Sequence, residues 1–276
     1  MATEKVLISV KTYPSLSRKY DELVCTAGVR QDGSWVRLYP IPFRKMGYDK
    51  QYRKYEWLEV DLVRNEKDFR PETFRIRNVE SIKRIGEIPT DKDGTWAQRR
   101  DMLLRKVYDS KEQLIKDAYN PEIYRSLAMF KPTRITNFII KEAESREWNK
   151  ETLEYIEAKL HQIDLFSGVP EIFKVVKKLP FTFYYEFLDS EGKKSTLQII
   201  DWEIGALYWN CIKRFTGDEK EACECVKKKY WTDFALTKDI YLILGTTKEY
   251  HAKRAPNPFV IIGVFPPKFE YQLRLL

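Results

Sequence analysis

The stretch Asp32-Gly33-Ser34-Trp35-Val36-Arg37-Leu38-Tyr39-Pro40 has the pattern of a hairpin turn followed by a β-strand. An Asp-Gly pair supplies the positive φ angles that a tight hairpin needs. From Trp35 to Tyr39 the side chains alternate, with Trp35, Arg37 and Tyr39 on one face and Val36 and Leu38 on the other. A proline then ends the strand. The stretch therefore predicts a hairpin, and it leaves open which of its two faces meets solvent.

Short alternating segments surround this hairpin. Residues 4–12, 23–29, 56–65 and 73–78 are each predicted to be strands, and several short strands at close spacing are typical of a small barrel. The spacing changes to a helical period over 96–118, and a further short helix is predicted within 122–129. We therefore expect an N-terminal β-barrel domain of OB or PUA-like type over residues 1–125, ending in a helical connection.

The remainder of the chain, 126–276, is predicted to form a C-terminal α+β domain. Strands are expected at 131–140, 181–188, 195–200, 240–245 and 259–265, and helices at 150–162, 203–215 and 219–229. The predicted fold class is therefore α+β.

The composition excludes several classes of protein. At 43% hydrophobic and 33% charged residues over 276 positions, the chain can bury a core and is not disordered. No apolar run approaches the length of about 20 residues that spans a bilayer, so we expect no membrane partner. Without a secretion signal, the expected location is the cytoplasm, with reduced thiols. Cys223 and Cys225 are spaced too closely for a typical zinc site, so no metal or cofactor is expected.

Positive charge is concentrated near the N-terminus. The net charge is +8, and residues 11–54 hold ten lysines or arginines against four acids. Cationic side chains interleaved with flat rings can neutralise phosphates and stack bases. The residues predicted to bind nucleic acid here are Trp35, Arg37, Tyr39, Arg44, Lys45, Tyr52, Arg53 and Lys54. The alternatives are an anion site for a protein or small molecule, and an ordinary surface whose rings belong to the core.

Two loops have the composition of anion sites. Ser15-Leu16-Ser17-Arg18-Lys19 can hold a phosphate through hydroxyls, backbone N–H groups and charge, which adds Ser17, Arg18 and Lys19 to the predicted nucleic-acid-binding residues. Gly245-Thr246-Thr247-Lys248 could also bind an anion, although it lacks the second glycine of a P-loop. His251 follows it and is expected to be a solvated loop residue rather than a general base.

Asp201-Trp202-Glu203 follows a predicted strand and offers the strongest candidate for catalysis. Asp201 and Glu203 could coordinate Mg²⁺ for phosphodiester cleavage, the only setting in which a cofactor is expected. The same residues could instead start a helix, with Asp201 as its cap and Glu203 in its first turn. We favour the cap.

Two stretches resemble a group of largely uncharacterised prokaryotic proteins with an N-terminal dual-OB-type domain. The first runs from Leu7-Ile8-Ser9-Val10-Lys11 through Ser17-Arg18-Lys19 and Cys25-Thr26-Ala27-Gly28-Val29 to the Gly33–Pro40 strand. The second contains Ile199-Ile200-Asp201-Trp202-Glu203, Leu244-Gly245-Thr246 and the run from Pro258 to Pro267. The resemblance implies an OB-like fold, nucleic-acid binding by analogy, and compatibility with antiviral defence or mobile elements. It implies no reaction.

Three functions follow from these observations. The first is a non-catalytic protein that binds DNA or RNA through the basic, aromatic β surface. The second is a metal-dependent nuclease or other nucleic-acid-processing enzyme that uses Asp201 and Glu203. The third is an adaptor with a protein partner. The first agrees best with the clustering of charge and aromatic rings.

Overall fold

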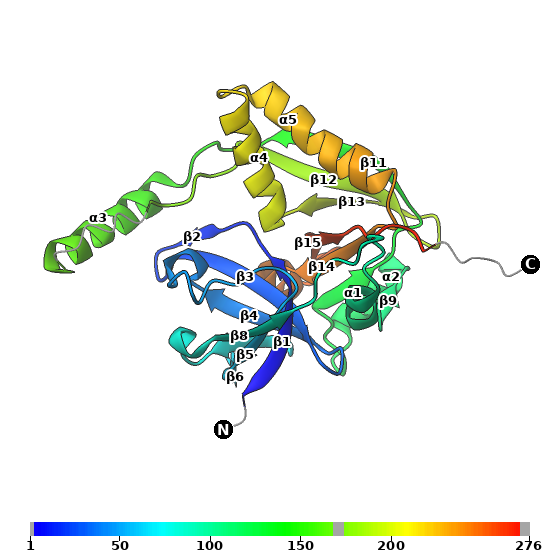
Figure 1. The fold of residues 1–276 in the computed structure, drawn as a ribbon, viewed down its shortest axis with the longest axis horizontal. Coiled ribbons are helices and arrows are strands. Elements are labelled where there is room, and N and C mark those ends of the chain that lie inside the picture. The colour runs from blue at the N-terminus through cyan, green and yellow to red at the C-terminus, as the bar shows by residue number, and fades with distance from the viewer. Residues whose placement is uncertain (1–2, 168–173, 271–276) are drawn as a thin grey trace, which may run out of the picture.

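Two β-sheets packed against each other form the body of the molecule (Figure 1). The computed structural model describes residues 3–167 and 174–270, with side chains described outside 160–173. The first sheet consists of β1 (Glu4–Lys11), β2 (Ser15–Ser17), β3 (Asp21–Arg30), β4 (Trp35–Ile41), β5 (Glu56–Val60), β6 (Leu62–Arg64), β7 (Thr73–Ile76) and β8 (Lys83–Glu87). The second consists of β9 (Val107–Tyr108), β10 (Leu127–Phe130), β11 (Arg134–Glu142), β12 (Phe181–Leu188), β13 (Lys194–Ile199), β14 (Tyr241–Thr246) and β15 (Phe259–Phe265).

Helices join and cover these sheets. They are α1 (Ala97–Leu103), α2 (Lys111–Tyr119), α3 (Lys150–Ser167), α4 (Trp202–Arg214), α5 (Glu219–Lys227) and α6 (Lys248–Ala252), with a π-helical segment η3 (Lys228–Ala235) and short 3-10 turns η1 (Phe43–Lys45) and η2 (Val79–Ser81). The predicted α+β class is therefore confirmed. Within the described residues, no helix combines the length and the apolar character needed to cross a bilayer.

The first sheet curls into a half-barrel. β1, β3 and β4 form an antiparallel meander, and β7 lies parallel to β4 at one end of it. β5 and β6 are separated only by Asp61, yet β5 pairs with β1 and β6 pairs with β7. This one bent strand therefore pairs with β1 at one end of the meander and with β7, the neighbour of β4, at the other. The predicted hairpin joins β3 to β4, and of its Asp-Gly pair only Gly33 takes a positive φ, because the turn spans four residues and closes from Gly33 N–H to Arg30 C=O at 2.9 Å.

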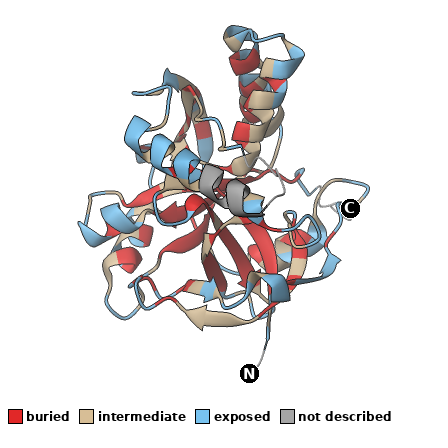
Figure 2. Ribbon diagram, turned by 90° about the vertical axis from the view of Figure 1, so that its left-hand side faces the viewer, coloured by how far each residue is buried: buried red, intermediate tan, exposed pale blue. Residues whose placement is uncertain are grey.

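Both faces of the hairpin strand β4 are buried. Val36 and Leu38 lie inside the half-barrel with Val6, Ile8 and other apolar residues. Trp35 lies on the outer face, in a second apolar cluster that includes Met129, Ile243 and Ile262 of the second sheet. The second sheet thus covers the outer face of the first. Figure 2 shows the buried residues concentrated in the strands at the centre of the molecule.

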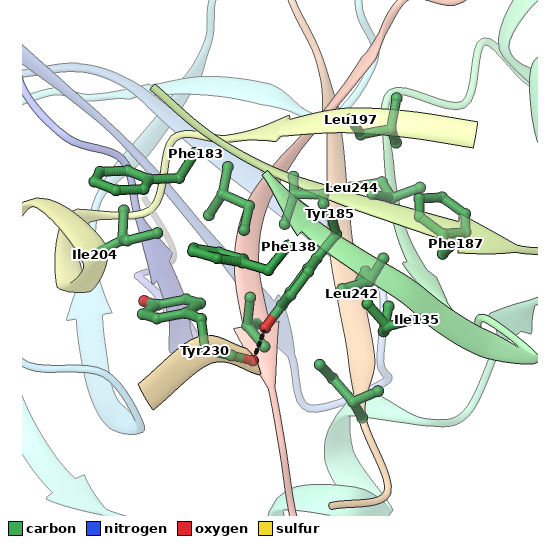
Figure 3. Packing of buried hydrophobic residues seen from close by; sticks show 14 of the residues in the cluster. Ile135, Phe138, Phe183, Tyr185, Phe187, Leu197, Ile204, Tyr230, Leu242 and Leu244 are labelled. Atoms are coloured by element: carbon green, nitrogen blue, oxygen red, sulfur yellow. Dashed lines mark hydrogen bonds between the residues drawn. The ribbon is translucent and has the colours of Figure 1, made fainter. Parts of the chain in front are cut away.

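The second sheet packs on its other face against α4, α5 and η3. Alternation along β10 sends Leu127 and Met129 towards the first sheet and Ala128 and Phe130 towards the helices. The helical side is rich in rings, and the hydroxyl of Tyr185 donates to the backbone oxygen of Tyr230 (Figure 3). Because both faces of this sheet are apolar, it must be covered twice, once by helices and once by the half-barrel.

Three local predictions differ from the structure. Residues 127–130 form strand β10 rather than part of a short helix, because they pair between β9 and β14. The 45–55 segment, whose polar sequence suggested a short helix, contributes only the last residue of η1 and is otherwise irregular. Cys211 and Cys225, expected to be reduced, are joined as a disulfide where α4 packs on α5, while Cys25 and Cys223 are free.

Helix α3 extends away from both sheets (Figure 1). Polar contacts join it to the first sheet: the Arg18 guanidinium lies 2.9 Å from the Glu151 carboxylate, and the Lys159 ammonium lies 2.9 Å from that of Asp21. The indole N–H of Trp148 donates to Val176 O at 2.7 Å, which joins the two chain segments that lead into and out of α3.

Candidate functional site

The open basic and aromatic surface predicted around the hairpin is not what the structure shows. Trp35, Arg37 and Tyr52 are 8%, 2% and 1% exposed, and Tyr39 is half-buried. Tyr52 lies inside the half-barrel, where its hydroxyl is 2.8 Å from Thr26 Oγ1. Trp35 and Arg37 are covered because the second sheet packs on their face of β4. The strand pattern could not reveal this cover, since the covering strands lie more than 80 residues away in the sequence.

The remaining predicted cations do not form one free patch. Arg18 pairs with Glu151, Arg44 with Glu22, and Lys45 with Asp21. Ser17 is half-buried on β2, while Lys19 is exposed with its ammonium 5.0 Å from the Tyr20 ring centroid, and Arg53 is exposed. Two of these partners, Glu22 and Asp21, belong to the counted stretch itself, and Glu151 neutralises positive charge from outside it.

Lys54 meets the two residues that were candidates for catalysis. Its ammonium lies 3.2 Å from Asp201 Oδ2 and 2.7 Å from Glu203 Oε2. Asp201 caps α4 by accepting from the Glu203 N–H at 3.1 Å, as the favoured interpretation predicted. Burial alone would lower the pKa of Lys54, but the two carboxylates raise it well above its ordinary value. The cluster is thus a charged clamp between the half-barrel and α4.

No group of three or more metal-binding side chains gathers anywhere in the described residues. Burial raises the pKa of the Asp201 carboxyl well above its ordinary value, and the nearby Glu203 adds to this effect. The Mg²⁺-dependent nuclease that would use these two residues stays a prediction.

A cavity of about 490 Å³ lies between the two sheets. Three stretches that the sequence singled out separately meet there: the hairpin strand through Arg37 and Tyr39, the serine loop through Ser15, and the Gly245–Lys248 loop. The other residues that line it are Thr12, Tyr13, Pro14, Cys25, Arg70, Ala143, Trp148, Lys178, Leu179, Phe181, Thr182, Phe183, Gln198, Ile199, Ile200, Val260 and Ile262. Four cations and no carboxylate are among these lining residues, so the cavity favours an anionic ligand.

Arg37 is the central cation of this cavity. Its Nη1 donates to Ser126 Oγ at 2.8 Å and its Nη2 to Ser126 O at 3.0 Å. Ser126 Oγ in turn donates to Glu72 Oε2 at 2.8 Å. Within the described part of the chain, Arg37 forms no ion pair of its own, and burial lowers its pKa. Because a buried cation is costly without a direct counter-charge, this guanidinium is suited to receive an anion.

Arg70 is a second buried cation, which the sequence interpretation missed. It lies in the loop between β6 and β7, pairs with the carboxylate of Asp68, and donates to Thr246 O. It is 5% exposed. Its local pairing with Asp68 does not mark it as a cavity residue, because the contact that brings it there is with Thr246, 176 residues away. The contact joins the half-barrel to the Gly245–Lys248 loop.

Two family models divide the chain into two regions, and each region contains one of the two sheets that form the cavity. A family model described as Domain of unknown function (DUF8757) matches residues 107–276. The chain belongs to the DUF8757 family. A second model, Domain of unknown function (DUF8758), matches residues 2–105. The DUF8758 region supplies Arg37 and Arg70 to the cavity, and the DUF8757 region supplies Lys178 and Lys248.

Other comparisons add little to this assignment. The search of curated proteins found no match. Among solved structures, the chain is similar to a murine DNA-binding protein bound with double-stranded DNA, at 8% identity and a TM-score of 0.32, with 99% of this chain and 98% of that chain covered. A likeness at this TM-score carries no argument about fold or function.

His251 in the DUF8757 region is buried, not solvated as predicted. It is 2% exposed, its Nε2 lies 2.7 Å from Ala118 O, and its Nδ1 lies 3.2 Å from Thr246 Oγ1. The rings of Phe69 and Tyr119 pack edge-on against it. This imidazole therefore contacts the Gly245–Lys248 stretch through Thr246 and helps to hold it in place.

The burial of His251 predicts an acid-sensitive fold. Burial lowers its pKa below the ordinary value of 6.5, so the unfolded chain binds a proton that the native protein does not. The free energy of unfolding should therefore fall as the pH drops below about 6.5. Urea denaturation at a series of pH values measures this slope. His251→Gln, which keeps an N–H near Ala118 O, should flatten it, and an unchanged slope would assign the effect to other groups.

Proposed function

We propose that this DUF8757 protein binds nucleic acid at the cavity between its two regions, using the half-barrel as an OB-type module. The observation that carries the proposal is the convergence of Arg37, Arg70, Lys178 and Lys248 on one cavity that no acid lines. Phosphate is the anion that such arginine and lysine sets recognise best.

The strand pairings support an OB-type module. An OB fold is a five-stranded Greek-key barrel that binds oligonucleotides on its second and third strands and on the loops that follow its first and fourth strands. In this chain the five strands correspond to β1, β3, β4, the bent β5–β6 strand, and β7. The second and third strands are then β3 and β4, and the two loops are those after β1 and after β6.

The cavity lies at the strands and loops that would correspond to the ligand-binding surface of an OB fold. Cys25 of β3 and Arg37 of β4 line it, as do Thr12 to Ser15 from the loop after β1 and Arg70 from the loop after β6. OB folds also bind oligosaccharides, so the barrel alone does not choose the ligand. The cationic lining and the net charge of +8 favour a polyanion over a neutral sugar.

Two half-exposed or exposed lysines offer the sharpest test. Lys178→Ala and Lys248→Ala should each weaken the binding of a fluorescently labelled oligonucleotide, DNA or RNA, as followed by anisotropy between about 50 and 200 mM salt. Each variant should also reduce the slope of log K against log salt by about one, because one phosphate contact is lost. Neither lysine forms an ion pair within the described residues, so the fold should survive.

Lys83→Ala provides the matched control. Lys83 is 71% exposed on the edge strand β8, away from the cavity, and its change should leave both affinity and salt slope as in the wild type. If neither DNA nor RNA binds at low salt, the proposed function is wrong. If both bind but the three lysine variants behave alike, binding occurs on another surface.

A further inference from the structure

The cavity is a partly open pocket between two walls rather than a long groove. The half-barrel forms one wall and the second sheet forms the other, with β3 and β4 facing β13 to β15 (Figure 1). Its volume of about 490 Å³ falls within the range typical of small-molecule sites, roughly 300–1,000 Å³. Proteins that hold extended single strands use open grooves that follow the backbone. The volume is therefore of the size that one nucleotide of a strand would fill.

Flat rings and aliphatic side chains make up much of the cavity wall. Tyr13, Tyr39, Trp148 and Phe181 contribute rings, and Ile200 and Ile262 lie among them. The Tyr13 ring is fixed in place, because its hydroxyl donates to Lys177 O at 2.7 Å and accepts from the Trp209 indole at 2.8 Å. A nucleobase that has left its stack is held by stacking on such surfaces.

Gln198 supplies a polar group that can identify a base. It lies on β13, is half-buried and lines the cavity. Within the described residues its side-chain amide has no hydrogen-bond partner, although an amide offers two donors and an acceptor oxygen. A base edge presents complementary donors and acceptors. Gln198 is therefore placed to read a base at the wall opposite Arg37.

We infer that the cavity receives a single nucleotide turned out of its strand, with the base among the aromatic side chains, Gln198 reading the base edge, and the phosphate at Arg37 and the neighbouring cations. This inference rests on the proposed function and names the unit that the site recognises. A duplex carrying an unpaired nucleotide should bind more tightly than its fully paired counterpart, because less pairing and stacking energy is lost when the nucleotide leaves the helix.

The first experiment uses the wild-type chain with a labelled oligonucleotide and unlabelled nucleoside 5′-monophosphates as competitors. Mononucleotides should displace the oligonucleotide, and the four bases should differ in potency. Gln198→Ala should weaken the preferred mononucleotide about tenfold and reduce the difference between bases. Gln98→Ala is the control, because Gln98 is exposed on α1 and does not line the cavity. Circular dichroism verifies that both variants are folded.

Chemical labelling of Cys25 tests where the ligand binds without any substitution in the protein. This free thiol lines the cavity and is half-buried, whereas the other free cysteine, Cys223 of α5, is buried in the core. A bound mononucleotide should slow the alkylation of Cys25, measured by peptide mass mapping. Alkylation at an unchanged rate under saturating nucleotide would place the ligand elsewhere and overturn the inference.

The outcomes separate the two proposals. If the oligonucleotide binds but no mononucleotide displaces it, and Gln198→Ala binds as the wild type does, the single-nucleotide site is wrong and the proposed function stands. If mononucleotides bind and no oligonucleotide does, the protein is a nucleotide-binding protein and both proposals are wrong in their stated form. Displacement, base preference and Cys25 protection together support the inference.

Discussion

Replacing Lys54 by methionine is expected to lower the free energy of unfolding by about 3–5 kcal/mol, because it leaves a buried carboxylate without its counter-charge. Lys54 is 13% exposed in its side chain and Asp201 only 2%. The Lys54 ammonium is also one of the contacts between the half-barrel and the start of α4. Urea denaturation at neutral pH measures the loss.

The pH dependence of this loss of stability tests whether the unpaired Asp201 carboxylate causes it. Burial already raises the pKa of Asp201, and the Lys54 charge opposes that rise. Without Lys54, the native state should bind a proton on Asp201 at pH values where the unfolded chain, with a pKa near 3.8, does not. The stability of Lys54→Met should therefore recover relative to the wild type as the pH falls towards about 4.

Two further variants complete the Lys54 experiment. Asp201→Asn in the Lys54→Met background removes the uncompensated charge and keeps a good helix cap, so it should restore part of the lost stability. Lys83→Met is the surface control, because the pair of Lys83 with Glu59 is exposed and should contribute no more than about 1 kcal/mol. Equal losses of unfolding free energy for Lys54→Met and Lys83→Met would contradict the stabilising role of the Lys54–Asp201–Glu203 cluster.

Gly205→Ala is expected to lower the free energy of unfolding by about 1–3 kcal/mol, although alanine is normally the better helix former. A Cβ at Gly205 in α4 would lie 2.2 Å from Cδ2 and 2.4 Å from Cε2 of the Tyr13 ring. That ring cannot move easily, because its hydroxyl is held by Lys177 O and the Trp209 indole. Thermal or urea denaturation gives the change.

A double-mutant cycle separates the steric clash from helix propensity. In a Tyr13→Ala background the ring is gone, so Gly205→Ala should change sign and stabilise the protein by up to about 1 kcal/mol. Gly47→Ala is the matched control, since the only close neighbour of its Cβ is the carboxylate end of the exposed Asp49. If Gly205→Ala costs the same with and without Tyr13, the two residues do not pack as described.

Both predictions concern the docking of the half-barrel on the second sheet, which creates the cavity. Tyr13 is itself a cavity residue, and Lys54 lies in the same half-barrel. Changes that loosen this docking are therefore expected to weaken ligand binding as well as stability. Lys178→Ala and Lys248→Ala should weaken binding alone, which distinguishes an effect on the ligand from an effect on the fold.

The sequence by itself determined the hairpin, most strands and the helix cap at Asp201, and it singled out the three stretches that meet at the cavity, because these depend on alternation, turn residues and capping within a few positions. Only the tertiary structure decided which face of β4 is buried, because the apolar second sheet, distant in the sequence, packs on the face that carries Trp35 and Arg37. That packing converts an expected open surface into a partly open cavity, brings Arg70 and Gln198 to it, and pairs Lys54 with Asp201. Long-range burial and charge pairing leave no local sequence pattern, so the sequence of the hairpin alone could not predict them.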